Sequence, residues 1–125
     1  MKLTAIRENH LYSKAYARGK KYVAKNIVVY VLPDYAASKL AKANPEKKKL
    51  NRVGITVTKK LGGAVLRNRA KRIIREGYRL SDKEAPIKKG FLIVIVARGA
   101  IVKAGSGDIR KDIDKAMEAL SMRLK

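Results

Sequence analysis

The sequence has no cysteine and no tryptophan, and its 125 residues include one histidine and ten acidic residues. Without cysteine the chain can form neither disulfide bonds nor thiolate metal sites. Nucleophilic and acid–base catalysis depend on a well-placed base, and His10 is the only imidazole. We expect His10 to be a surface residue near the start of a short helix. The sequence therefore predicts no catalytic residue.

Clustered carboxylates, which metal-assisted hydrolysis needs, are also scarce. Asp82 and Glu84 fall in a segment that we expect to be a loop. Asp112 and Asp114 are two residues apart on an expected helix, so their side chains diverge. We expect no metal ion to be bound tightly by the protein alone.

Long apolar runs are missing too. The longest, residues 91–97, has the length of a strand and is far shorter than the roughly 20 residues of a membrane-spanning helix. Before the polar residues 7–9 there is no apolar segment of signal-peptide length. We therefore expect a cytoplasmic protein with no membrane partner.

Positive charge is what the sequence has in excess. Its 31 lysines and arginines outnumber its 10 acidic residues, giving a formal net charge of +21. Such a charge repels itself in a compact chain, which favours a polyanionic partner. Nucleic acid is the natural choice, because cationic side chains release the counterions condensed on its phosphates. The hydrophobic content of 46% is enough for a core, so we expect residues 1–125 to form a single domain.

Residue patterns predict the element order α-β-β-β-α-β-α. The expected helices cover residues 10–18, 64–80 and a segment from about 108, and the expected strands lie near residue 22 and at 27–32, 53–58 and 91–96. This order predicts an α+β fold, a single-domain α/β sandwich with helices packed on a mixed sheet of about four strands. Residues 33–51 are expected to be an exposed connection, with one or two helical turns near 36–43.

The expected helix 64–80 separates apolar from basic residues. The apolar sector, expected to face the sheet, contains Leu66, Ala70, Ile73, Ile74, Gly77 and Leu80. The opposite sector contains Arg67, Asn68, Lys71, Arg72, Arg75 and Arg79, with Arg69 at its flank. Glu76 is the only acid between Lys59 and Ser81, whereas a solvated helix face usually mixes charges of both signs. This face is predicted to bind nucleic acid, although an ordinary charged helix face is the alternative.

Residues 59–76, KKLGGAVLRNRAKRIIRE, resemble the signature of the bacterial ribonuclease P protein subunit. The resemblance implies a left-handed crossover that places the signature helix beside the sheet. It also implies that the partners are a catalytic RNA and precursor tRNA, and that the RNA performs the hydrolysis with Mg²⁺. Two departures are Ala70, where the family usually has a larger aliphatic residue, and the unaligned connection 33–51.

By this resemblance, two sets of residues are candidate binding sites. The candidate RNA-binding residues are Lys59, Lys60, Arg67, Asn68, Arg69, Lys71, Arg72 and Arg75. The candidate leader-binding residues are Tyr12, Tyr16 and Tyr30, on the first helix and the strand 27–32. Tyrosine rings suit a single strand of variable sequence, because every base offers a π face. The alternative is that these tyrosines belong to the core or its rim.

Two other functions remain open from the sequence. A structural RNA-binding protein of the ribosomal type would have the same basicity and small size. A stand-alone nuclease would need catalytic groups that the chain lacks. The sequence leaves the oligomeric state undetermined.

Overall fold

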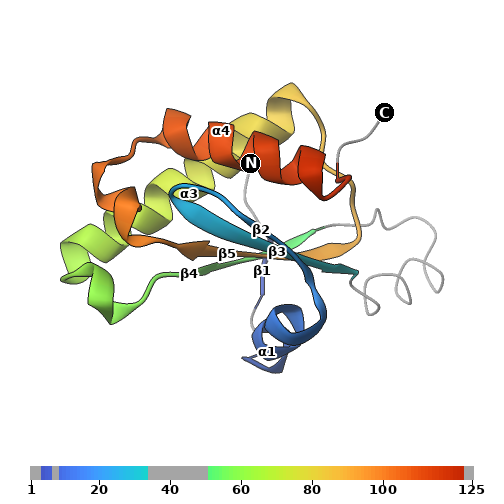
Figure 1. The fold of residues 1–125 in the computed structure, drawn as a ribbon, viewed down its shortest axis with the longest axis horizontal. Coiled ribbons are helices and arrows are strands. Elements are labelled where there is room, and N and C mark those ends of the chain that lie inside the picture. The colour runs from blue at the N-terminus through green and yellow to red at the C-terminus, as the bar shows by residue number, and fades with distance from the viewer. Residues whose placement is uncertain (1–3, 7–8, 34–50, 123–125) are drawn as a thin grey trace.

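A computed structural model describes residues 4–6, 9–33 and 51–122 (Figure 1). Its elements are β1 (Thr4–Ala5), α1 (Asn9–Arg18), β2 (Lys20–Val23), β3 (Ile27–Pro33), β4 (Arg52–Thr56), the 3-10 helix η1 (Lys59–Leu61), α3 (Ala64–Glu84), β5 (Phe91–Ala97), the 3-10 helix η2 (Gly99–Lys103) and α4 (Ser106–Ala119). The predicted order is confirmed, with the two-residue strand β1 added in front. The helical turns predicted near 36–43 lie outside the described residues.

The strands form one mixed sheet in the order β1-β4-β5-β3-β2. β4 is parallel to β1 and β5, whereas β3 is antiparallel to β5 and β2. β5 is the middle strand, and Leu92 to Ile95 are all buried. β5 is thus covered on both faces, and the predicted mixed sheet is confirmed.

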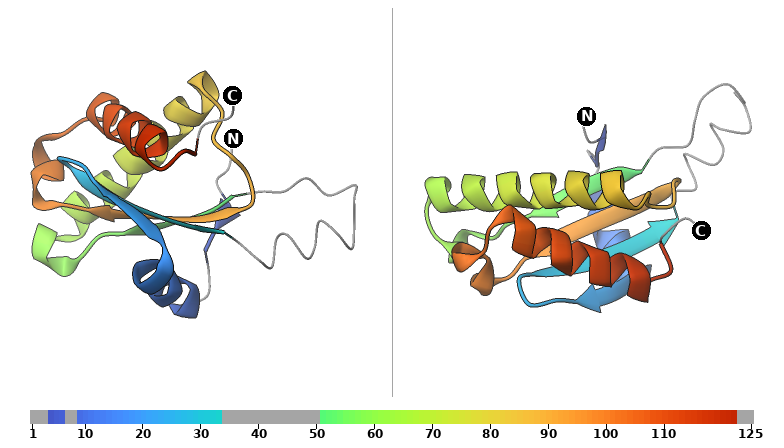
Figure 2. Two further views of the ribbon diagram at one scale, coloured as in Figure 1. Left: turned by 45° about the vertical axis from the view of Figure 1, so that its right-hand side comes forward. Right: turned by 90° about the horizontal axis from the view of Figure 1, so that it is seen from above.

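Helix α3 connects the parallel neighbours β4 and β5. When the right-hand view of Figure 2 is turned so that these strands point upwards, β5 lies to the left of β4 behind α3. The crossover is therefore left-handed, as the family resemblance implied. Residue spacing could not have indicated this, since about 98% of such crossovers are right-handed.

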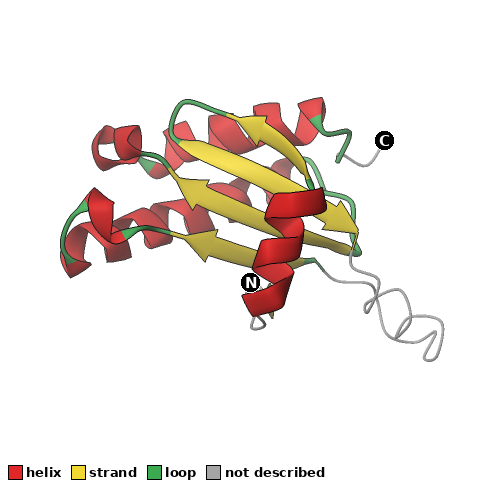
Figure 3. Ribbon diagram, turned by 60° about the horizontal axis from the view of Figure 1, so that its bottom comes forward, coloured by secondary structure: helices red, strands yellow, loops and turns green. Residues whose placement is uncertain are grey.

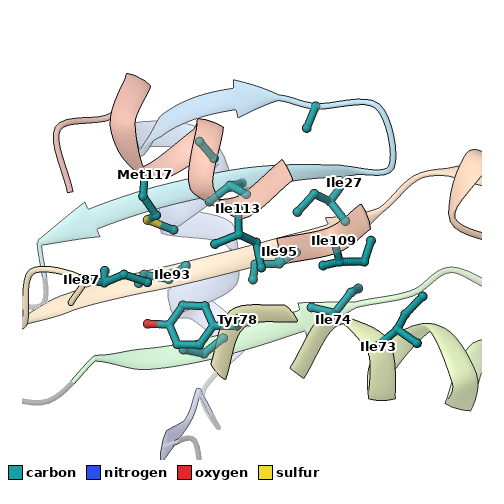
Figure 4. Close-up of a cluster of buried hydrophobic side chains, with 14 of the residues drawn as sticks. Ile27, Ile73, Ile74, Tyr78, Ile87, Ile93, Ile95, Ile109, Ile113 and Met117 are labelled. Atoms are coloured by element: carbon teal, nitrogen blue, oxygen red, sulfur yellow. The ribbon is translucent and has the colours of Figure 1, made fainter. Parts of the chain in front are cut away.

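The helices form two layers of unequal size around the sheet. α3 and α4 cover one face, and α1 lies across the other (Figures 1 and 3). Between the sheet and the two longer helices is the main core, where Ile74, Tyr78, Ile95 and Ile113 pack together (Figure 4). The buried residues under α1 are fewer: Ile6, Ala15, Leu32, Leu92 and Val94.

Helix α3 is longer than predicted, because it continues to Glu84 instead of ending at residue 80. The prediction that Asp82 and Glu84 lie in a loop is therefore wrong. Asp82 is buried in the last turn of the helix, where its Oδ1 accepts a hydrogen bond from the Ile87 backbone N–H at 3.0 Å. Glu84 forms an ion pair with Arg110 of α4. Both carboxylates thus help to hold the end of α3 in place.

The first turn of α3 also differs from prediction. Ala70, Ile73, Ile74 and Gly77 are buried as expected, but Leu66 is 41% exposed. Leu66 packs instead over the turn before the helix: its Cδ1 lies 2.6 Å from the place that a Cβ on Gly62 would occupy. Gly62 has a φ of +143°, a conformation that strongly favours glycine.

Candidate nucleic-acid interface

The basic face of α3 lies on the side of the helix turned away from the core. Asn68, Arg72 and Arg75 are exposed, and Lys71 is half-buried. Among the described residues, none of these four forms an ion pair or a side-chain hydrogen bond. Their hydrogen-bonding groups are therefore available to an external partner, and like charges on neighbouring turns favour one that is anionic.

Glu76 neutralises only one cation of this face, because it is paired with Arg79. The Arg79 Nε donates to Glu76 Oε2 at 3.2 Å, and a second bond joins Nη2 to Oε1. The hydrogen bond from Arg79 lowers the pKa of the Glu76 carboxyl below its usual value. The only acid in this part of the helix is thus occupied by a cation outside the candidate RNA-binding set.

Arg67 and Arg69 have different surroundings from the rest of the set. The Arg67 Nε is buried and has no hydrogen-bond partner in the described part of the chain. The guanidinium of Arg69 donates to two backbone carbonyls near η2: Nη2 to Ala104 O at 2.7 Å and Nη1 to Val102 O at 3.3 Å. Arg69 therefore fastens η2 to α3.

The candidate set continues from the helix towards the sheet. Lys59 and Lys60 are exposed on η1, which follows β4 after two residues. No side chain caps the first turn of α3 at Gly63, and nothing lies within 4 Å of the Cβ that Gly63 lacks. Backbone N–H groups at an open helix start attract phosphate, and here two lysines flank them.

The three candidate tyrosines meet on the opposite face of the sheet, beside α1. The rings of Tyr16 and Tyr30 are in edge-to-face contact, with centroids 5.0 Å apart and planes at 76°. The Tyr16 hydroxyl is hydrogen-bonded to Thr56 Oγ1 at 3.0 Å. Tyr16 is 41% exposed, whereas Tyr12 and Tyr30 are half-buried. The tyrosines therefore form a partly open aromatic surface, bounded by α1, β3 and β4.

Tyr12 lies directly over β4. A Cβ on Gly54 would lie 2.6 Å from the Tyr12 hydroxyl oxygen and Cε1, so only glycine leaves room for the ring. Burial, and then the nearby Tyr16, raise the pKa of the Tyr12 phenol above its usual value. Gly54 and Thr56 were missed as parts of this surface, although a glycine inside a strand often marks such a close approach.

β4 connects the two candidate sites. Gly54 and Thr56 contact the tyrosines, and Lys59 begins the basic region three residues later. A single strand of nucleic acid that leaves the aromatic surface at the end of β4 would therefore meet lysine side chains next. The basic residues thus begin three residues after the strand that contacts the tyrosines. The helix α3 and the tyrosines beside α1 nevertheless lie on opposite faces of the sheet.

Within the described ranges, no group of three or more histidine, cysteine or acidic side chains could hold a metal ion. The same residues include no helix that is long and apolar enough to span a membrane.

Comparison with known proteins gives a consistent match. The Ribonuclease P family profile matches residues 1–121. A ribonuclease P protein component from Clostridium perfringens is 36% identical over 118 residues, covering 94% of this chain and 86% of that protein. The ribonuclease P protein component from Clostridium acetobutylicum is 37% identical over 113 residues, covering 90% and 85%.

Solved structures agree with the sequence relatives. The Staphylococcus aureus RNase P protein has a TM-score of 0.73 and 25% identity, covering 97% of this chain and 98% of that one. The Thermotoga maritima RNase P protein shares the fold with a TM-score of 0.70 at 23% identity, covering 92% and 96%.

Proposed function

The chain belongs to the ribonuclease P protein family, and we propose that it binds a catalytic RNA through α3 and the 5′ leader of precursor tRNA through the tyrosines beside α1. Its place is in tRNA 5′ processing, as a subunit of an endoribonuclease. In this proposal the RNA performs the hydrolysis and the protein positions the substrate. The family match also decides against a ribosomal protein.

The arrangement around β4 is the observation that best supports this proposal. Three tyrosines form one open surface under α1, and the basic residues begin where β4 ends. The aromatic rings can stack on leader bases of any sequence. The lysines and arginines can contact phosphates of the catalytic RNA, which fix position without reading sequence.

The protein's contribution to the reaction would be electrostatic and geometric. Mg²⁺ supplied through the RNA would provide the metal chemistry, and we propose no tight metal site on the protein. A leader held on the tyrosines places the scissile bond near the catalytic RNA, so part of the entropy cost of the reaction is met by binding. Cations on α3 and η1 would reduce repulsion between phosphates that must approach each other.

Reconstitution tests the proposal. RNA-free protein should not cleave precursor tRNA, whereas protein with the cognate catalytic RNA and Mg²⁺ should release the 5′ leader. The control is the catalytic RNA alone at the same Mg²⁺ concentration, which should be slower. Specific 5′ cleavage by rigorously RNA-free protein would contradict the assignment of the hydrolysis to RNA.

A further inference from the structure

A cleft of about 300 Å³ opens on the side of α4 away from α3. Its lining comes from three regions: the turn between β2 and β3, η2 with the residue after it, and one side of α4. The volume is at the lower end of the range of ligand clefts, about 300–1,000 Å³. It is separate from the basic face of α3 and from the tyrosines beside α1.

Four lysines surround this cleft: Lys25, Lys103, Lys111 and Lys115. All four are exposed, and in the described part of the chain none forms an ion pair with an acidic side chain. Lys111 and Lys115 are one helical turn apart on α4, so their ammonium groups project to the same side. Lys25 and Lys103 reach the same space from the β2–β3 turn and from η2.

The two acidic residues of the cleft already accept hydrogen bonds from the protein. Asp112 is buried, and its Oδ2 accepts hydrogen bonds from the Asn26 backbone N–H at 3.1 Å and from Asn26 Nδ2 at 3.0 Å. Asp108 Oδ2 accepts from the Gly105 backbone N–H at 2.9 Å. Four lysines against these two carboxylates leave the lining with an excess of positive charge.

The walls of the cleft are fixed to the rest of the fold. The Asn26–Asp112 bonds fasten the β2–β3 turn to α4. Arg98 fastens the same turn to the end of β5, because its Nη1 donates to Ala24 O at 2.7 Å and its backbone N–H to Asn26 O at 2.9 Å. A cationic cleft with pinned walls loses little conformational entropy when it binds an anion.

The residues of η2 lie between this cleft and the proposed RNA-binding face. Arg69 of α3 donates hydrogen bonds to the carbonyls of Val102 and Ala104. Lys103 and Ala104, in the same segment, line the cleft. The start of α3, η2 and the β2–β3 turn gather at one end of the molecule, on the left in Figure 1. One RNA surface could therefore follow α3, pass η2 and reach the cleft.

We propose that this cleft is a second binding site for the phosphate backbone of the catalytic RNA. The inference rests on the proposed function, since it takes the same RNA as its partner. Lysines suit backbone phosphates because each is a point charge with no fixed fork for reading base edges. The leader is not the occupant, because its proposed tyrosines lie on the other face of the sheet, beside α1.

The test removes two charges and leaves a polar, slightly shorter side chain at each position. Lys111→Gln with Lys115→Gln is compared with Lys83→Gln, an exposed lysine in the last turn of α3, far along that helix from η2. Binding of the catalytic RNA is measured between about 50 and 200 mM salt. Over this range of salt, each phosphate contact lowers the binding constant by roughly a factor of three. With two contacts removed, the salt-induced drop in the binding constant should therefore be about tenfold smaller for the double variant than for wild type.

The outcomes separate this inference from the proposed function. A double variant with wild-type affinity and salt dependence would overturn the cleft proposal, provided that wild type binds the RNA. Failure of wild type to bind the catalytic RNA would instead contradict the proposed function. Melting temperatures of both variants should match wild type, because the three lysines are exposed.

A second measurement distinguishes RNA phosphate from a free anion. Inorganic phosphate is titrated into the full chain while the amide resonance of Asn26 is followed. If phosphate perturbs that resonance but the double variant binds the RNA like wild type, the cleft is a small-anion site and the proposal is overturned. A perturbation lost in the double variant, together with weaker RNA binding, supports it.

Discussion

The two faces of the sheet differ in how thoroughly they are covered. Under α3 and α4 the strands contribute Ile27, Val29, Ile93 and Ile95 to a core that is closed by two long helices. On the other face, the alternate residues of the same strands pack against α1, a single helix of 10 residues. Half-buried and exposed tyrosines surround this smaller cluster. Stability therefore comes mainly from one face, and the other retains aromatic surface for a ligand.

The same division appears within β5. Ile93 and Ile95 point towards α3 and α4, whereas Leu92 and Val94 point towards α1. One strand thus contributes to both clusters, and substitutions one or three residues apart should have different consequences.

Truncation of β5 should have the largest effect. Ile95→Ala and Leu92→Ala each remove a large, buried aliphatic side chain, and such changes cost about 2–5 kcal/mol. Ile95→Ala should lie near the upper limit, because two helices hold the cavity open. Leu92→Ala should lie near the lower limit, because α1 and its rim can move in. Urea unfolding measures both, and equal losses would contradict the contrast between the faces.

Removal of the Tyr16 ring should affect the ligand more than the fold. Tyr16→Ala should weaken binding of precursor tRNA to the holoenzyme by about 1–3 kcal/mol, the usual value of one base–aromatic stack. Binding of mature tRNA, which lacks the leader, should be nearly unchanged. Competition binding with both RNAs gives the difference directly.

Tyr16→Phe is the matched control for this effect. It keeps the ring and its contact with Tyr30 but removes the hydrogen bond to Thr56. Precursor binding close to wild type would assign the role to the ring face. An equal loss on precursor and mature tRNA in Tyr16→Ala would instead indicate a structural tyrosine.

The smallest effect should be a pH dependence of the free energy of unfolding that comes from Tyr12 on the α1 face. Burial raises the pKa of Tyr12 above its usual value of 10.0, so the folded protein favours the neutral phenol. This contribution to the free energy of unfolding is complete below pH 10 and declines as the pH rises through the folded-state pKa. Tyr12→Phe should remove the decline, measured as the difference between the two proteins in urea unfolding from pH 9 to 11. Parallel curves would contradict the buried-phenol explanation.

Local patterns in the sequence were sufficient for most of the fold. The strand 91–96 and the helix from about residue 108 were predicted, and in the structure Ile109, Ile113 and Met117 lie at helical spacing on the buried side of α4. Tyr30 alternates with Val29 and Val31 in the sequence, and in the structure its side chain lies on the opposite face of the sheet from theirs. Such patterns succeed because burial repeats every second residue in a strand and every three or four in a helix.

What the sequence did not predict depends on contacts between distant residues. β1 has two residues and is defined by its pairing with β4. Leu66 packs against the turn at Gly62 instead of the sheet, which leaves its side chain partly exposed. The bonds from Arg69 to Val102 and Ala104 span more than 30 residues. No local pattern encodes such pairs. The roles of the candidate site residues in RNA binding remain predictions.

The sheet order has a consequence for how the chain folds during its synthesis. β5 is the last strand to be made, yet it is the only link between the β4 side of the sheet and the β3 side. Until residue 97 has emerged, one edge each of β3 and β4 lacks its native partner, and such edges invite aggregation. Repulsion between nascent chains with a large positive charge opposes that association. The positive charge that favours RNA binding would thus also reduce aggregation of the nascent chain before β5 pairs with β3 and β4.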